Sequence, residues 1–389
     1  MAKITFKITA VTDVGLVRTN NEDNFVAISN LDLADSTWKS DEVCELGEKG
    51  ALLVVADGMG GMNAGEVASE IAISTVKELF TTGITEKTLS SSHSIISFMN
   101  EAIVTADKRI KSEGKHNPES RGMGTTIVIA WLYKGLLYVS WCGDSRAYIY
   151  NEALGLVQIT KDHSYVQELV DQGVISPEDA FDFPESNVIT RCLSHSSLKA
   201  EPENLRVPYR VSQGDIILLC TDGLSGMIRD NEISSIIAAN TTSMADCANA
   251  LIEAAKAAAG ADNITVDLCQ VLSVGNDIVQ TPTASLEDFQ QPTLQPGKKK
   301  GKRKSHKVDA PSSDGQSKIT QTLVLNTKRH SGKIKVIVIV LLLLAVAVGG
   351  HFAWKYFSSK PNVEPTEQPD SVAQQDSSDV SDIDTTYQS

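Results

Sequence analysis

Hydrophobic and polar positions divide the chain into a patterned region of about 270 residues, a polar stretch and one long apolar run. In the first region, short runs rich in Val, Ile, Leu and aromatic residues are bounded by Gly, Asp, Asn or Pro, which is the pattern of β-strands. These strands are expected at 4–13, 23–29, 51–58, 125–133, 136–144, 146–150, 204–211, 215–223 and 263–272. Lys134 and Gly135, which separate two of them, predict a tight hairpin.

Helical periodicity appears between these strands. In 64–80, one helix face collects Val67, Ala68, Ile71, Ala72, Thr75, Val76 and Leu79. Further helices are expected at 94–111, 231–240 and 244–260, the last ending on a glycine. This order of elements matches neither βαβ alternation nor an all-β chain. We therefore expect an α+β fold for residues 1–274, a four-layer αββα sandwich of two antiparallel β-sheets flanked by helices.

The long apolar run lies near the C-terminus. From Val336 to Trp354, nineteen consecutive residues include no Asp, Glu, Lys or Arg, and a helix that spans a bilayer needs about 20 such residues. A buried core helix is the alternative interpretation, but nothing nearby in the sequence could bury it. The pattern therefore predicts a C-terminal transmembrane helix at 334–354.

The segments on either side of this helix predict its orientation. The linker at 275–333 is polar and becomes rich in Lys and Arg, the tail at 355–389 is acidic, and both have the composition of disordered chain. Because positive flanks stay inside, we expect a single-pass protein of the cell membrane with the large domain in the cytoplasm and the tail outside. The basic runs are either a topology signal or a surface for anionic lipid, and both interpretations stay open.

Charge and cysteine content narrow the classes of partner. The chain has 35 Lys and Arg against 49 Asp and Glu, and much of its positive charge lies in 291–335. The large domain is therefore acidic, which argues against nucleic acid as a partner because phosphates must be neutralised by basic residues.

The six cysteines form no CxxC pair, and four lie in apolar runs. This favours small core residues in a reducing compartment over disulfides or a zinc site.

Several of the expected strands have an aspartate at one end. Asp57, Asp144 and Asp222 follow apolar strands, and Asp262 precedes one. A single aspartate in such a place is most simply a turn former. Four that converged would repel one another without a counter-charge, which hard divalent cations with oxygen ligands supply. The glycines after Asp57 and Asp222 would let carbonyl groups and waters approach such ions.

Eight short motifs occur in a specific order over residues 5–272. They are RTNNED (18–23), DGMGGMNAGEVAS (57–69), GMGTT (122–126), GDSRAY (143–148), DHS (162–164), NVITRCLS (187–194), TDGLSGMI (221–228) and DNIT (262–265). Each is weak alone, but together and at this spacing they resemble the metal-dependent type 2C Ser/Thr protein phosphatases in their bacterial form. The resemblance implies a β-sandwich flanked by helices, with a centre of two Mn²⁺ or Mg²⁺ ions.

The resemblance also implies a role for each matching position. Asp57 should bridge both ions, Gly58 should offer its carbonyl oxygen, and Asp222 and Asp262 should ligate directly. Glu22 should act through a water, and Asp144 with Asp222 should form an additional metal site. Arg18 should bind the phosphate. Asp23 and Asn263 should support these ligands from behind.

The chemistry of these residue types agrees with that implication. Paired divalent ions lower the pKa of a water that can attack phosphorus, and an arginine fork holds phosphate oxygens, so no cysteine or serine nucleophile is needed. The chain departs from the family in one respect, since Met59 and Met62 stand near the DG motif where a histidine is common. The identity of the general acid therefore stays open. His163 is either a proton donor or a structural residue, and Glu66 either caps a helix or takes part in catalysis.

Residues 164–193 resemble the flap of bacterial members, a loop that lies beside the site and influences substrate access. The expected function is removal of phosphate from Ser and Thr residues of proteins, with a cognate Ser/Thr kinase among the substrates. The alternative is a catalytically inactive signalling or binding module, which would be expected to lack a metal-binding aspartate. A two-metal nuclease is disfavoured because the domain is acidic and lacks a basic groove.

Overall fold

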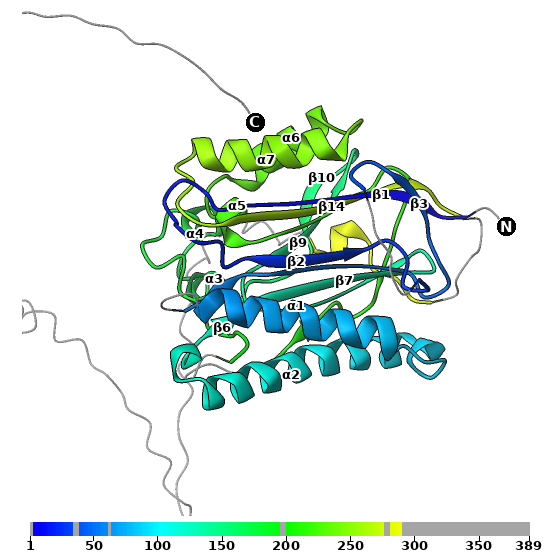
Figure 1. The fold of residues 1–389 in the computed structure, drawn as a ribbon. Coiled ribbons are helices and arrows are strands. Elements are labelled where there is room, and N and C mark those ends of the chain that lie inside the picture. Colours follow the sequence, from blue (N-terminus) through cyan, green and yellow to red (C-terminus); the bar gives the residue numbers. More distant parts are fainter. Residues whose placement is uncertain (1–2, 34–38, 61–63, 195–199, 276–280, 290–389) are drawn as a thin grey trace, which may run out of the picture. The chain divides into compact units, whose positions relative to one another are not determined.

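The computed structural model describes residues 3–33, 39–60, 64–194, 200–275 and 281–289. They belong to one compact unit, Met1–Lys298. Figure 1 shows two layers of strands enclosed between two layers of helices. The expected αββα arrangement of two antiparallel sheets is therefore confirmed for this part of the chain.

The described strands form two large antiparallel sheets. The first sheet runs in the order β10 (Gly155–Gln158), β9 (Arg146–Asn151), β13 (Ile216–Cys220), β14 (Ile264–Ser273), β1 (Thr5–Asp13) and β3 (Val43–Glu45). The second sheet runs in the order β11 (Glu203–Asn204), β8 (Leu136–Cys142), β7 (Ile127–Tyr133), β4 (Ala51–Ala56) and β2 (Asn24–Ile28), and β12 (Tyr209–Arg210) also pairs with β8. A short separate pair joins β5 (Gly58–Met59) to β6 (Gly124–Thr125).

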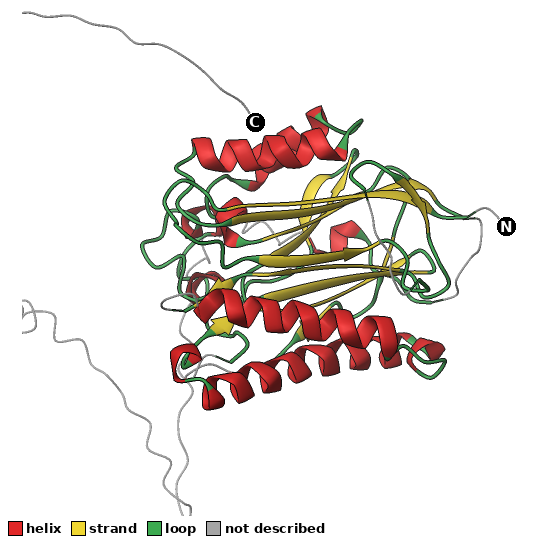
Figure 2. Cartoon of the chain, in the orientation of Figure 1, coloured by secondary structure: helices red, strands yellow, loops and turns green. Residues whose placement is uncertain are grey.

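Helices cover the outer face of each sheet (Figure 2). The second sheet packs against α1 (Ala64–Thr82) and α2 (Ser92–His116), and the first sheet packs against α6 (Asp230–Ala239) and α7 (Met244–Ala257). Shorter helices are α3 (Tyr165–Asp171), α4 (Pro177–Ala180) and α5 (Asp222–Ser225), with 3₁₀ turns at Thr88–Ser90, Pro118–Ser120 and Leu286–Phe289.

Strand β4 shows why a continuous apolar run is required in the middle of this sandwich. All six of its residues are buried. Leu53 and Val55 pack between the two sheets, whereas Leu52 and Val54 pack against the helices on the other face. Alternate side chains of a strand point to opposite faces, so a strand covered on both sides needs hydrophobic residues at every position.

The hairpin and the cysteines agree with the sequence-based expectations. Strands β7 and β8 are joined by Lys134 and Gly135, both with positive φ (50° and 75°), as a two-residue turn of this hand requires. All six cysteines are free and five are buried. The five buried cysteines are therefore small core residues, and the sixth, Cys44, is partly exposed.

Two boundaries differ from the expected ones. The single strand expected at 204–211 is two short strands, β11 and β12, on either side of Pro208, because proline has no N–H for a continuous ladder. The linker was expected to begin at 275, yet residues 281–289 pack on the domain. Ala284 pairs with Tyr209, and Leu286 is only 4% exposed. Burial of apolar side chains holds this segment in place.

Within the described ranges, no helix is long and apolar enough to cross a membrane. The transmembrane helix expected at 334–354, the rest of the linker from 290 and the tail at 355–389 lie outside the described residues. They remain predictions.

Candidate active site

Antiparallel pairing brings the expected acidic residues to one end of the sandwich. In the first sheet, Asp13 at the end of β1 faces Ile264 at the start of β14, and β13 ends beside them at Cys220. In the second sheet, β2 begins where β4 ends. The residues that immediately precede or follow these strand ends therefore share one edge. We call Glu22, Asp57, Asp144, Asp222 and Asp262 the acidic edge.

The carboxylates of the acidic edge influence one another's protonation. Burial raises the pKa of Asp57 well above its usual value, and the negative charges of Asp222, Asp23 and Asp144 raise it further. Burial and then the charge of Asp222 likewise raise the pKa of Asp144 well above its usual value. Burial and then the charge of Asp262 raise the pKa of Asp222. A cluster of this kind binds protons or cations in order to reduce its repulsion.

Arg18 contributes positive charge at the rim of this cluster. Its Nη2 donates to Asp262 Oδ2 at 2.7 Å, and the arginine side chain is 51% exposed. Burial raises the pKa of Glu22, and the charge of Arg18 opposes that rise. Among the described residues, no three His, Cys, Asp or Glu side chains are grouped tightly enough to hold an ion as they stand. One oxygen of the acidic edge, Asp262 Oδ2, is instead engaged by Arg18.

Asp23 and Asn263, the residues expected to support the ligands, are both buried, and the charges of Asp222 and Asp262 act on Asp23. The buried Asp23 accepts hydrogen bonds at Oδ2 from Thr221 and Thr265, at 2.8 and 2.7 Å. Burial raises its pKa to about 7, although these two hydrogen bonds oppose the rise.

Asn263 fastens the loop that carries Arg18 and Glu22. Its Oδ1 accepts from the Glu22 N–H at 2.8 Å. Its Nδ2 donates to the carbonyl oxygens of Val14 at 3.0 Å and Asn20 at 2.8 Å. One buried amide side chain therefore holds the loop at three points.

Gly58 lies where a side chain would not fit. A Cβ there would meet the carbonyl oxygens of Gly65 and Glu22 at 2.3 and 2.4 Å. The Gly58 N–H donates to Glu22 at 3.2 Å, and the Asp57 N–H donates to Thr126 Oγ1 at 3.1 Å. The glycine after Asp57 is therefore needed for close backbone packing that positions the aspartate.

His163 is held by contacts typical of a structural residue. The Gly143 N–H donates to its Nδ1 at 3.1 Å, and its Nε2 lies 3.1 Å from Glu203 Oε2. The ring stacks on Trp141 and is 5% exposed. Burial lowers its pKa, although the hydrogen bond to Glu203 opposes this effect. Because both ring nitrogens are engaged, this structure favours the structural interpretation over a proton donor.

Arg146 is a residue of the site that the sequence interpretation missed. Its guanidinium makes three hydrogen bonds to Asp162, at 3.0, 3.0 and 2.7 Å, and donates to Tyr148 at 2.8 Å. Its positive charge lowers the pKa of both Asp144 and Asp222, against the larger effect of burial. The arginine within GDSRAY was the available signal, but only the fold shows that its charge acts on the acidic edge.

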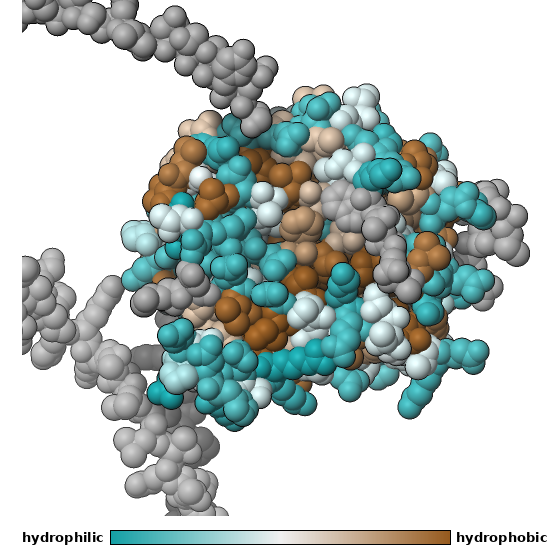
Figure 3. All heavy atoms as spheres, in the orientation of Figure 1, coloured by the Kyte–Doolittle hydropathy of each residue, from teal (hydrophilic) through white to brown (hydrophobic). Residues whose placement is uncertain are grey.

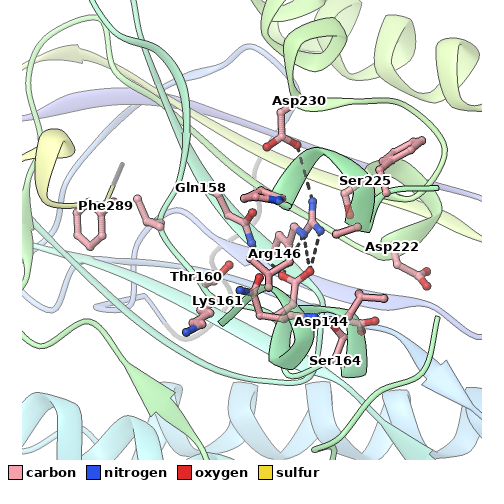
Figure 4. A pocket seen from close by; sticks show the side chains of 18 of the residues that line it. Asp144, Arg146, Gln158, Thr160, Lys161, Ser164, Asp222, Ser225, Asp230 and Phe289 are labelled. Carbon is pink, nitrogen blue, oxygen red and sulfur yellow. Dashed lines mark hydrogen bonds and ion pairs between the residues drawn. The ribbon is translucent and has the colours of Figure 1, made fainter. Parts of the chain in front are cut away.

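A large cavity extends from the acidic edge beneath the flap. It has a volume of about 1660 Å³, and its lining includes Asp144, Asp222 and Asp262. Figure 4 shows Asp144, Arg146 and Asp222 among the lining side chains, with Phe289 in another part of the lining. The flap contains α3 and α4, and α4 begins at Pro177 with Ser176 capping it. The volume of the cavity is therefore far larger than a single metal ion needs.

Comparison with known proteins decides the family. Residues 35–259 match the family model described as Protein phosphatase 2C. The chain belongs to the protein phosphatase 2C family. It is 34% identical over 261 residues to the serine/threonine phosphatase stp of Listeria innocua, an alignment that covers 67% of this chain and 93% of that protein. It is 33% identical over 274 residues to the phosphatase PstP of Mycobacterium tuberculosis, covering 70% of this chain and 46% of PstP.

Solved structures agree with this protein phosphatase 2C assignment. The crystal structure of Mycobacterium tuberculosis PstP/Ppp has a TM-score of 0.57 and 32% identity, covering 69% of this chain and 100% of that one. The PstP catalytic domain in complex with two manganese ions has a TM-score of 0.55 and 31% identity, with the same coverage. The expected family and the enzyme class, a protein serine/threonine phosphatase, are confirmed. The expected cofactor, Mn²⁺ or Mg²⁺, is supported by the manganese complex.

Proposed function

We propose that the acidic edge is the metal centre of a protein serine/threonine phosphatase that hydrolyses phosphoserine and phosphothreonine directly. The observation that carries this proposal is the convergence of Asp57, Asp222 and Asp262, which are far apart in sequence and whose charges act on one another. Carboxylate oxygens are the ligands that Mn²⁺ and Mg²⁺ prefer. The residue types of the acidic edge therefore suit such ions.

The proposed ligands divide into direct and indirect ones. Asp57 would hold both ions, and Asp222 and Asp262 would each hold one. Gly58 would contribute its carbonyl oxygen, and Glu22 would act through a water. Asp144 together with Asp222 would hold an additional ion. Asp23, held by two threonines, and Asn263, held by the loop carbonyls, would fix the backbone behind these ligands. Such ions supply an acidified water as the nucleophile and offset the charge of the phosphate.

Arg18 would bind and orient the phosphate. Its guanidinium is half-exposed and already reaches the acidic edge through Asp262. A planar guanidinium can hold two phosphate oxygens at once, which fixes the phosphorus in one orientation. Transfer of Arg18 from Asp262 to a phosphate would also free a ligand oxygen of Asp262 for an ion.

The alternative of an inactive binding module has less support. Inactive members of an enzyme family are expected to lack a residue that the chemistry needs, and here none of the expected metal-binding carboxylates is missing. A chelator experiment on the full-length protein tests the proposal. Turnover of p-nitrophenyl phosphate and of a phosphothreonine peptide should require added Mn²⁺ or Mg²⁺. Hydrolysis that continued in excess chelator would exclude this mechanism.

We further propose that the enzyme is anchored in the cell membrane by the predicted helix at 334–354, with the catalytic domain in the cytoplasm and the tail outside. The apolar run and its positively charged N-terminal flank support this topology. The full chain should sediment with membranes, whereas a chain ending at Gly297 should remain in the supernatant. Equal distribution of the two chains would contradict the anchor.

We propose a Ser/Thr kinase among the phosphorylated protein substrates, because the bacterial phosphatases that this chain resembles imply a cognate kinase of that class. Purified protein should remove phosphate from the autophosphorylated cytoplasmic domain of a Ser/Thr kinase from the same organism. Phosphopeptide mapping before and after treatment measures this directly. A kinase domain that kept all its phosphate while a phosphothreonine peptide was hydrolysed would exclude it.

A further inference from the structure

Hydrophobic side chains are exposed directly beside the residue proposed to bind phosphate. The loop between β1 and β2 presents Val14, Leu16 and Val17, which are 37%, 63% and 66% exposed. We call these three residues the apolar rim. Val17 is adjacent in sequence to Arg18, so the rim begins next to the proposed phosphate position. Figure 3 shows hydrophobic surface at the left edge of this face, where Figure 1 places the loop that follows β1.

Exposed hydrophobic residues are not spread evenly over the described surface. Nine large hydrophobic side chains are classed as exposed there, and three of them form the apolar rim. Three others, Tyr165, Val174 and Val188, belong to the flap. Single exposed hydrophobic residues are common, but a group beside a cleft is typical of a surface that contacts another molecule.

The apolar rim is held in place by the backbone around it. The Leu16 N–H donates to the Gly260 carbonyl at 2.8 Å, and the Asn263 side chain donates to the Val14 carbonyl at 3.0 Å. Gly15 has a φ of +77° and packs so closely that a Cβ would lie 2.2 Å from the Asp262 carbonyl oxygen.

These contacts have two consequences. The loop has a defined conformation even though its side chains point into solvent. It is also tied to the segment that carries Asp262, so the apolar rim and the acidic edge keep a constant separation. Because the loop is already ordered, little conformational entropy is lost when a partner covers it, and this favours binding.

We infer that the apolar rim is a substrate-recognition surface, and that it favours phosphoproteins with a large hydrophobic side chain within about three residues of the phosphorylated Ser or Thr. This inference rests on the proposed function, because it takes Arg18 as the phosphate-binding residue. An extended peptide advances about 3.3 Å per residue, so a substrate whose phosphate reaches Arg18 must place its neighbouring residues close to Val17 and Leu16. A hydrophobic side chain there removes apolar surface from water on both partners.

Paired phosphothreonine peptides test this inference with the full-length, Mn²⁺-loaded protein. Each pair differs only in having Leu or Ser at one of the three positions on either side of the phosphothreonine. At one or more of these positions, the wild-type protein should show a kcat/KM about tenfold higher for the Leu peptide, because burial of one such side chain is worth roughly one factor of ten or more. Leu16→Ser with Val17→Ser should reduce that preference to about twofold or less.

Val43→Ser is the matched control. Val43 is 57% exposed, like the rim residues. It lies on β3, which pairs with Thr5–Lys7 at the end of β1 away from the loop. This variant should retain the preference for the Leu peptide.

Three outcomes would overturn the inference. The first is a wild-type protein without a Leu preference at any position. The second is a double variant that keeps the preference for the Leu peptide, even if that variant self-associates less than the wild-type protein. The third is a double variant that loses turnover of p-nitrophenyl phosphate by the same factor as turnover of the Leu peptide, since the loop would then be only structural. Failure of wild-type protein to hydrolyse p-nitrophenyl phosphate with Mn²⁺ would instead reject the proposed function.

Discussion

The acidic edge and the N-terminus of α7 are two regions that use the same carboxylate group in opposite ways. At α7, Asp41 accepts hydrogen bonds from Ser243 Oγ at 2.8 Å and from the N–H groups of Met244 and Ala245 at 2.7 and 3.2 Å. Burial alone would raise the pKa of Asp41, but these donors hold it below its usual value. At the acidic edge, burial and neighbouring carboxylates raise the pKa values instead.

The difference shows how a folded chain separates stability from function. The carboxylate at α7 accepts hydrogen bonds from N–H groups that have no partner within the helix, and so stabilises the fold. The carboxylates at the acidic edge lack enough donors, so bringing them together reduces stability unless cations bind there. A region that is unfavourable by itself but favourable with a ligand is typical of a binding site.

The largest effect is expected from Asp222→Asn. Loss of this carboxylate should reduce turnover of p-nitrophenyl phosphate on the order of 1000-fold, because the remaining groups no longer complete the metal centre. Without metal ions the same variant should unfold at a higher temperature than wild type, since one of the repelling charges is gone. Turnover and thermal unfolding in chelator measure the two effects. The control is Glu70→Gln, which removes an exposed carboxylate from α1 and should change neither turnover nor the unfolding temperature. Activity of Asp222→Asn above a tenth of the wild-type activity would contradict the assignment of Asp222 as a metal ligand.

A second test compares the acidic edge with a carboxylate in the interior. Asp267 is 0% exposed, and neither of its oxygens has a hydrogen-bond partner within the described residues. It lies opposite Ala10 and Leu219 in the first sheet, and burial raises its pKa well above the usual value. Asp267→Val should therefore increase the free energy of unfolding by about 1–3 kcal/mol, the usual cost of an unsatisfied buried group.

Urea unfolding of the metal-free protein measures this change. Asp267→Asn keeps a polar group at the same position and should gain less stability than the valine variant. If valine instead lowered the free energy of unfolding, Asp267 would be shown to have a partner or a role of its own.

The smallest effect is expected at the stabilising carboxylate. Asp41→Ala should lower the free energy of unfolding by about 1–2 kcal/mol, the usual cost of losing a helix cap. Asp41→Asn, which retains one acceptor oxygen, should lose less. Because the pKa of Asp41 is lowered in the folded protein, the contribution of its charge should be complete above the unfolded pKa of about 3.9 and disappear as the pH falls through the folded pKa. Urea unfolding between neutral pH and pH 2 checks this, and a loss that did not depend on pH would contradict it.

Much of the fold could be predicted because its signals are local. Strand β4 is hydrophobic at every position and α1 has one apolar face, so each indicates its own conformation without knowledge of the rest of the chain. The positions of Asp57 and Asp222 at strand ends could be read in the same way. The end of the domain could not, because residues 281–289 have a polar composition and are held by a partner, Tyr209, that is distant in sequence.

The sequence by itself determined the alternation of strands and helices, the acidic residues at strand ends and, through its motifs, the phosphatase family. Only the tertiary structure decided which charges act on one another, namely that the charge of Arg146 reaches Asp144 and Asp222 and that Arg18 pairs with Asp262. It also decided that the apolar rim lies beside these charges. The physical reason is that secondary structure depends on neighbours in sequence. The energy of a charge or of an exposed hydrophobic side chain instead depends on what the folded chain places around it.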